Sequence, residues 1–254
     1  MKPSRYIVGI DLGTTNCAVA YVDTFEQEDE SPEIRLLRIP QVVTPGTVEE
    51  QQLLPSFCYQ IATGELPEGS LDLPWQEGTG FVVGTFGHSG ADRTAPLLPW
   101  GAPEEVTHIS PIEASSRLLK HIRDGWNHVI AEGNPDFFLE SQEIFLTVPA
   151  SFDATARELT VRAAEMASIS RATLLEEPQA AFYAWIESTQ EGWRKEVSVG
   201  DVILVCDIGG GTTDFSLILV SESQGELVLE RIAVGDHILL GGDNIDLTLA
   251  YAIR

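Results

Sequence analysis

The sequence predicts an α/β protein with a mixed sheet and two lobes, of which the second is incomplete. Three observations carry this prediction. Short apolar segments rich in β-formers alternate with helical patterns, which is typical of α/β architecture. Three such segments precede the first helix, so we expect a mixed sheet instead of a purely parallel one. A hairpin pattern near the N-terminus also recurs in the last fifth of the chain.

The N-terminal part is expected to be mostly strand and loop. Residues 6–10 and 18–22 are apolar runs separated by Asp-Leu-Gly-Thr-Thr-Asn, a hairpin signal, and 34–39 is the expected third strand. From 40 to 105, prolines and a glycine cluster predict a loop-rich insertion with little regular structure.

The first helix is expected to begin at Ser110-Pro111, because proline suits the first turn of a helix. Leu118, Ile122 and Trp126 recur at every fourth position. That spacing places the three side chains on one buried helix face.

Strands and helices alternate through the second half. Residues 143–148 and 172–175 are expected strands, 190–200 a linker, 202–206, 215–220 and 227–234 a run of three strands, and a last helix starts at Asn244. A helix capped by Asp153 is expected to bury Leu159, Ala163 and Met166, and one opened by Pro178 to bury Ala181, Trp185 and Ala184.

Charge and cysteine content narrow the function classes. With 39 acidic and 15 basic residues the formal net charge is -24, which argues against binding nucleic acid or an anionic membrane. The three cysteines fit no disulfide framework or zinc site, and Cys17 and Cys206 are expected to be small buried hydrophobes. Because no signal peptide or apolar run of ~18 residues is visible, a reducing, cytoplasmic location is expected.

The repeated hairpin is the most informative feature. Residues 7–22 and 203–220 each read as an apolar strand, an aspartate, a glycine turn, two threonines and an apolar return strand. Glycine leaves backbone N–H groups unshielded, and consecutive free N–H groups form an anion site. A carboxylate there needs a bridging hard cation, and Mg²⁺ with its waters fits. One copy alone is also typical of an ordinary turn, whereas two copies in the same order favour phosphate binding.

These residues resemble a known family, the DnaK-type 70-kDa heat-shock chaperones. The resemblance rests on five segments that follow one another along the chain: 10–16, 147–157, 176–181, 207–214 and 235–246. Segments 10–16 and 207–214 look like the family's two phosphate motifs. It implies an actin-like (ribonuclease H-like) ATPase fold, with residues 1–195 as the first lobe, 40–105 as its insertion and 196–254 as the start of the second lobe.

The resemblance also implies site residues. MgATP or MgADP would be held by the phosphate-binding residues Gly13, Thr14, Thr15, Asn16, Gly209, Gly210, Gly211, Thr212, Thr213, Gly241 and Gly242. Asp11 and Asp207 would hold the Mg²⁺ through water, and Glu177 would place the attacking water. Asp11, Glu177, Asp207 and Thr212 are therefore the expected catalytic residues. Pro149 and Arg157 would relay the nucleotide state to a client-binding domain.

The sequence departs from the family pattern in two places. The family places a lysine near the γ-phosphate, but no lysine lies between Lys2 and Lys120, and Arg93 is the nearby cation. An arginine is not equivalent to a lysine there. The family's second lobe, with its adenosine contacts, also continues beyond Arg254, so we expect a fragment, an engineered truncation or a degenerate relative with uncovered apolar core.

Three functions remain open from the residues. The first is the ATPase domain of a chaperone, whose client proteins and co-chaperones act only on the full-length protein. The second is a module that binds nucleotide without hydrolysis, or a scaffold. The third is a small-molecule kinase of the same superfold, because fold does not fix function.

Overall fold

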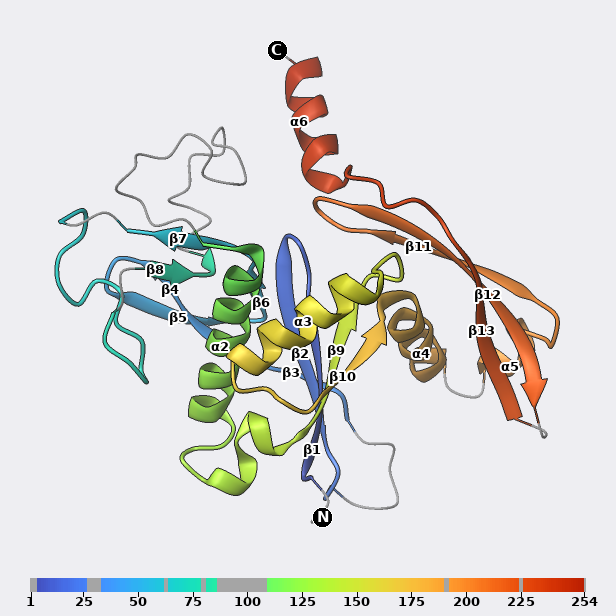
Figure 1. Ribbon diagram of the computed structural model, residues 1–254, viewed down its shortest axis with the longest axis horizontal. Coiled ribbons are helices and arrows are strands. Elements are labelled where there is room, and N and C mark those ends of the chain that lie inside the picture. The colour runs from blue at the N-terminus through green and yellow to red at the C-terminus, as the bar shows by residue number, and fades with distance from the viewer. Residues whose placement is uncertain are drawn as a thin grey trace. The chain divides into compact units, whose positions relative to one another are not determined.

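The computed structural model describes residues 4–26, 33–61, 64–78, 81–85, 109–189, 192–223 and 226–253 (Figure 1). The chain forms two compact units, each described by itself below. Unit 1 comprises Met1–Leu146 and Ala156–Thr173, and unit 2 comprises Thr147–Thr155 and Leu174–Arg254. This division differs from the expected boundary after residue 195, because helix α4 (Glu177–Thr189) contacts strand β11 (Val202–Ile208) of unit 2.

The main sheet of unit 1 is mixed. Its strand order is β10-β9-β1-β2-β3, with β6 also paired to β2. The strands are β1 (Tyr6–Leu12), β2 (Asn16–Asp23), β3 (Arg35–Leu36), β6 (Leu53–Pro55), β9 (Glu143–Val148) and β10 (Ala172–Glu176). Strand β1 runs antiparallel to β2 and parallel to β9. The expected mixed sheet is thus confirmed, as is the expected first hairpin.

Helix α2 (Pro111–Val129) follows the predicted pattern closely. The Ser110 hydroxyl accepts a hydrogen bond from the Glu113 N–H at 3.2 Å and caps the helix. Leu118, Ile122 and Trp126 are all buried, as the four-residue spacing predicts. Two short 3₁₀ helices, η1 (Pro135–Phe137) and η2 (Leu139–Ser141), then lead into β9.

Segment 40–105 contains more regular structure than the sequence predicts. Its described residues hold β5 (Thr47–Gln51), β7 (Cys58–Gln60) and β8 (Phe81–Val83), besides β6 and most of β4 (Ile39–Thr44). Strand β4 pairs with β5 and β7 with β8, both antiparallel. The expected third strand is also split, since β3 ends at Leu36 and β4 begins at Ile39. Buried Ile39, Val42 and Val82 explain the order, which frequent prolines and glycines conceal in the sequence.

The predicted inner faces of two helices are wrong. Helix α3 (Ala154–Met166) begins directly after Asp153, as expected, but it buries Ala163 and Ala164 while Met166 is 53% exposed and Leu159 is exposed. The helix turns its small side chains inward, which permits close packing.

In α4, Phe182 is buried, whereas Ala181 and Ala184 are exposed and Trp185 is half-buried. The expected linker contains a short helix, α5 (Trp193–Glu196).

Unit 2 is built on a three-stranded antiparallel sheet, β11-β12-β13, as predicted. Strand β12 covers Thr213–Ser223, β13 covers Glu226–Val234, and helix α6 (Gly242–Ala252) follows. One face of β11 is open, since Leu204 is 57% and Ile208 63% exposed, which agrees with the expected uncovered core. Cys206 lies on this strand face and is exposed, so its expected burial is wrong; Cys17 is buried as expected.

Among the described residues, no helix is both long and apolar enough to cross a membrane.

Candidate phosphate-binding hairpins

The first hairpin joins β1 to β2 through a tight glycine turn. A Cβ atom on Gly13 would lie 2.4 Å from the Asn16 carbonyl oxygen, so only glycine fits. From the β6 side, the Ser56 hydroxyl donates to the Gly13 carbonyl at 2.6 Å, and the Ser56 N–H donates to the Thr15 carbonyl at 2.9 Å. The turn is therefore fixed by its carbonyl groups, which leaves its donors for a ligand.

Cys17 lies directly after this turn and keeps its surroundings neutral. Its sulfur lies 3.2 Å from the Ser56 oxygen, and burial raises the pKa of the Cys17 thiol to about 12. The thiol is thus uncharged at neutral pH. Asp11 supplies the negative charge instead, and its Oδ2 lies 3.8 Å from the place of a Cβ on Gly13, over the turn.

The second hairpin joins β11 to β12 and is closed by its own backbone. The Gly209 N–H donates to the Thr212 carbonyl at 2.8 Å. The register pairs Asp207 with Asp214 directly across the strands. Directly opposed residues point to the same sheet face, so two carboxylates lie on one face at the base of the turn.

The segment before α6 packs against this turn. The Gly242 N–H donates to the Gly209 carbonyl at 2.9 Å, and the Asp243 N–H donates to the Gly210 carbonyl at 2.8 Å. A Cβ on Gly241 would lie 2.4 Å from the Gly210 oxygen, so this glycine is what permits the contact. The Gly241 N–H donates to Asn244 Oδ1 at 3.0 Å.

The structure thereby divides nine of the eleven predicted phosphate-binding residues, all except Gly13 and Asn16, into two groups. The N–H groups of Gly209, Gly241 and Gly242 donate within the protein, and the Thr213 hydroxyl donates to the Leu240 carbonyl at 2.8 Å. The other group has donors with no acceptor in the described part of the chain: the N–H groups of Thr14, Thr15, Gly210, Gly211 and Thr212, and the hydroxyls of Thr14, Thr15 and Thr212. The first group shapes the turns, and the second can bind a ligand.

The predicted catalytic carboxylates come from both units. Asp11 belongs to unit 1, and Asp207 and Glu177 belong to unit 2. Both aspartates are exposed, and Glu177 is half-buried at the first turn of α4, where the helix dipole favours a carboxylate. In the described residues, no three His, Cys, Asp or Glu side chains gather to hold a metal directly.

The predicted relay residues also fall in different units. Pro149 follows β9 in unit 2, and Arg157 lies on α3 in unit 1. Arg93, the cation nearest in sequence to the missing lysine, lies outside the described residues.

Sequence reasoning missed a polar cluster around Asp214, which is 9% exposed. His237 Nδ1 lies 2.9 and 3.0 Å from the two carboxylate oxygens of Asp214, and the Ser151 hydroxyl donates to Asp214 Oδ1 at 3.4 Å. The cluster fixes the loop after Pro149 to the second hairpin within unit 2. Its sequence signal was the alternation along β12, which places Asp214 on the same buried face as Ile218 and so requires a polar partner.

A second tie to the same loop comes from β13. Arg231 forms an ion pair with Glu176 at 2.5 Å and donates to the Ala150 carbonyl at 3.3 Å. The residue before Glu177 is thereby held to the sheet of unit 2. A buried or half-buried pair of this kind orients its neighbours more than it stabilises the fold.

The mixed sheet, with β1 and β9 parallel and two hairpins of one pattern, defines an α/β protein of the actin-like ATPase fold class. Within this class the chain belongs to the Hsp70 family, since residues 102–254 match the family described as Hsp70 protein.

Several curated proteins that are similar to this chain are chaperones named HscA. The chain is 33% identical to the chaperone protein HscA homolog of Pseudoalteromonas atlantica over 95% of its own length and 36% of the relative's. It is 33% identical to HscA of Salmonella paratyphi B, covering 98% and 38% of the two chains, and 34% identical to the HscA homolog of Histophilus somni, covering 97% and 37%. The chain thus spans a little over a third of the length of these relatives.

Proposed function

We propose that this chain is the nucleotide-binding part of a chaperone ATPase and that both of its hairpins bind MgATP. The supporting observation is the set of donors that have no acceptor among the described residues: N–H groups and hydroxyls at Thr14, Thr15 and Thr212, and N–H groups at Gly210 and Gly211. Such groups bind phosphate oxygens at low cost because they need no rearrangement.

The carboxylates of Asp11 and Asp207 are the reason why the proposal includes a metal ion. Asp11 and Asp207 stand at the strand ends that precede the turns, and each carboxylate would repel a bare triphosphate. A Mg²⁺ ion with its waters reverses that repulsion and, when bound, neutralises charge that develops on the transferred phosphoryl group. The chain's own groups orient the phosphates from the turns, and Glu177 orients the attacking water.

Location and partners follow as further parts of this proposal. We infer a cytoplasmic protein that uses ATP and ADP, with client proteins and co-chaperones acting on the full-length protein. The Pro149 and Arg157 relay belongs to the same proposal.

Calorimetry and phosphate release test the proposal together. Purified chain 1–254 is expected to bind ATP only with Mg²⁺, and Asp207→Asn should lower phosphate release about 10²–10³-fold, the usual cost of one charge-stabilising group. Asp246→Asn is the matched control, because this exposed aspartate of α6 carries the same charge change in the same unit. An equal loss of phosphate release in both variants, or a turnover rate that EDTA does not lower, would refute the assignment.

A second candidate is nucleotide binding without turnover. It is favoured by the absence of any lysine between Lys2 and Lys120. Binding that is saturable at micromolar MgATP with no phosphate release would select it. If instead a carbohydrate acceptor accelerates ATP consumption, the chain is a small-molecule kinase of this superfold.

A further inference from the structure

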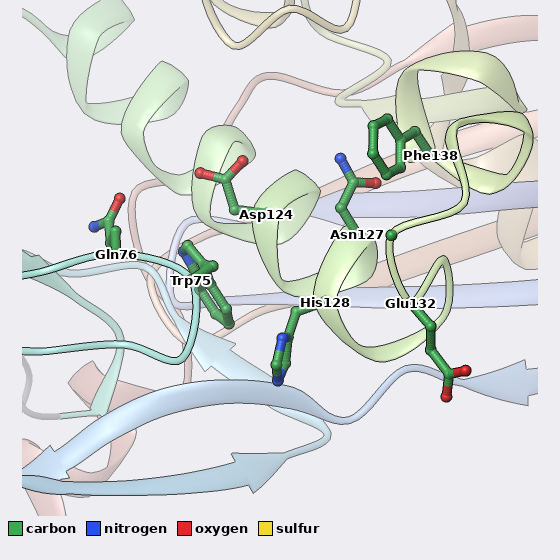
Figure 2. A pocket seen from close by; sticks show the side chains of 8 residues that line it. Trp75, Gln76, Asp124, Asn127, His128, Glu132 and Phe138 are labelled. Atoms are coloured by element: carbon green, nitrogen blue, oxygen red, sulfur yellow. The ribbon is translucent and has the colours of Figure 1, made fainter.

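A pocket of about 530 Å³ opens in unit 1, lined by none of the residues assigned to phosphate or metal. It lies between the C-terminal half of α2, the loop that carries Trp75, and the 3₁₀ segment around Phe138 (Figure 2). Asp124, Asn127 and His128 come from one face of α2, at positions three and four apart. Its volume is within the range of small-molecule sites.

One wall of this pocket is an aromatic ring held in a fixed orientation. Trp75 packs against α2 where Gly125 leaves room, since a Cβ there would lie 3.6 Å from the indole. Buried His121 meets the ring edge-on, with centroids 5.4 Å apart. Leu73 and Gln76 exchange two backbone hydrogen bonds, 2.9 and 3.1 Å, which close the loop that carries the ring. Trp75 remains half-buried, so part of it is open to a ligand.

The polar lining is acidic apart from His128, whose ring centroid lies 5.8 Å from that of Trp75. Asn127 is held in the wall, because its Oδ1 accepts from the Leu139 N–H at 2.8 Å and its Nδ2 donates to Glu140 at 3.1 Å. Asp124 accepts both bonds from Arg123 on Oδ1 alone, which leaves Oδ2 with no partner in the described chain. Glu132, at the rim, has a φ of +47°, and its carboxylate has no partner among the described residues.

We propose that this pocket binds an organic cation, the guanidinium group of an arginine or of a related small molecule, stacked on Trp75. A cation gains from the face of an indole, and the planar guanidinium stacks there better than an ammonium group. The free Oδ2 of Asp124 accepts from its N–H groups, and the Glu132 carboxylate adds negative charge at the rim. A metal ion fits less well, since a hard cation needs several oxygen ligands in place of an aromatic wall.

The surrounding charge supports the same ligand. The chain carries a formal net charge of -24, so its field attracts cations to any accessible acidic pocket. This inference is independent of the nucleotide proposal, because the test below reads the pocket and uses no nucleotide.

The test is an NMR titration of the whole chain, following the Trp75 indole N–H, which Trp75→Phe assigns. Arginine amide and a short peptide with one central arginine are the two sources of guanidinium, and citrulline amide is the analogue of the same shape whose side chain is uncharged. Saturable shifts of the indole with both arginine ligands, and none with citrulline amide, are expected. Tighter binding of the peptide identifies a polypeptide ligand, and equal binding identifies a small one.

Variants separate binding from folding. Glu132→Gln should weaken binding about threefold, because it removes one exposed negative charge at the rim, and Trp75→Leu about tenfold through the lost cation–π contact. Glu158→Gln on α3 is the matched control, because Glu158 is exposed and the substitution removes the same charge away from the pocket. Absence of saturable shifts, equal shifts with citrulline amide, or equal weakening by Glu158→Gln overturns the proposal. Glu132→Gln, at the surface, keeps the test valid if Trp75→Leu misfolds.

Discussion

Gly241→Ala is expected to release helix α6 from the second phosphate turn. The added methyl group would lie 2.4 Å from the Gly210 carbonyl oxygen and 2.5 Å from that of Gly209. Both neighbours are backbone atoms, so neither can rotate away. The segment before α6 must therefore move off the turn, and the contacts made by Gly242 and Asp243 are lost with it.

The magnitude follows from the bonds at stake. Gly242 and Asp243 donate to the turn at 2.9 and 2.8 Å, and the Thr213 hydroxyl donates to the Leu240 carbonyl at 2.8 Å. With about 1 kcal/mol for each hydrogen bond, local opening becomes easier by about 2–3 kcal/mol. Amide exchange at Gly242 and Asp243 should then accelerate about 30- to 150-fold, if these amides exchange by local opening.

Hydrogen exchange followed by NMR measures this change directly, and the adjacent glycine supplies the control. A Cβ on Gly242 would lie 3.8 Å from both the Gly209 oxygen and Gly210 Cα, which is an ordinary van der Waals contact. Gly242→Ala should therefore change the exchange rate of Asp243 by about twofold at most. The reasoning is refuted if Gly241→Ala exchanges like the unmodified chain, or if Gly242→Ala exchanges as fast as Gly241→Ala.

Two further predictions concern unit 1. Burial lowers the pKa of His121 from 6.5 to about 4, while its ring donates to the Pro40 carbonyl. Between these two pKa values the unfolded chain binds a proton at His121 and the folded chain does not, so the free energy of unfolding should fall by about 2 kcal/mol from pH 7 to pH 5. Urea unfolding measures this change, and His121→Gln should abolish it. Gly84→Ala should lower the free energy of unfolding by more than Gly46→Ala. Both glycines have positive φ, but only at Gly84 would the Cβ meet other atoms, Gln41 Oε1 at 2.6 Å and Leu54 Cδ1 at 2.7 Å. Equal urea midpoints for the two variants would contradict this prediction.

Helix α2 and the two hairpins could be predicted because their signals are local. The side chains of Leu118, Ile122 and Trp126 follow one another along a helix whose period is fixed, and the burial agrees. The hairpins combine strand, glycine turn and strand within about twenty residues, so no distant contact has to be known. The Asp207–Asp214 register follows from the turn itself.

Packing against distant segments could not be predicted in the same way. Apolar periodicity in α3 is satisfied by Leu159 and Met166 as well as by Ala163, and only the neighbouring segment decides which face is buried. The roles of the site residues could not be predicted for the same reason, since they too depend on distant segments. Thr212 and Thr213 are adjacent and chemically alike, yet one hydroxyl is used by the segment before α6 and the other is available.

The backbone hydrogen bonds from the start of α6 to the second turn couple the orientation of this helix to the conformation of the turn. Because its first N–H groups end on the carbonyls of Gly209 and Gly210, a rotation of the peptide groups in the turn carries the helix axis with it. The helix has 11 residues and so extends about 16 Å, and a tilt of about 5° at its base displaces its far end by roughly 1.4 Å. Small adjustments of the glycine backbone thereby become movements large enough for a distance probe near Ile253 to detect.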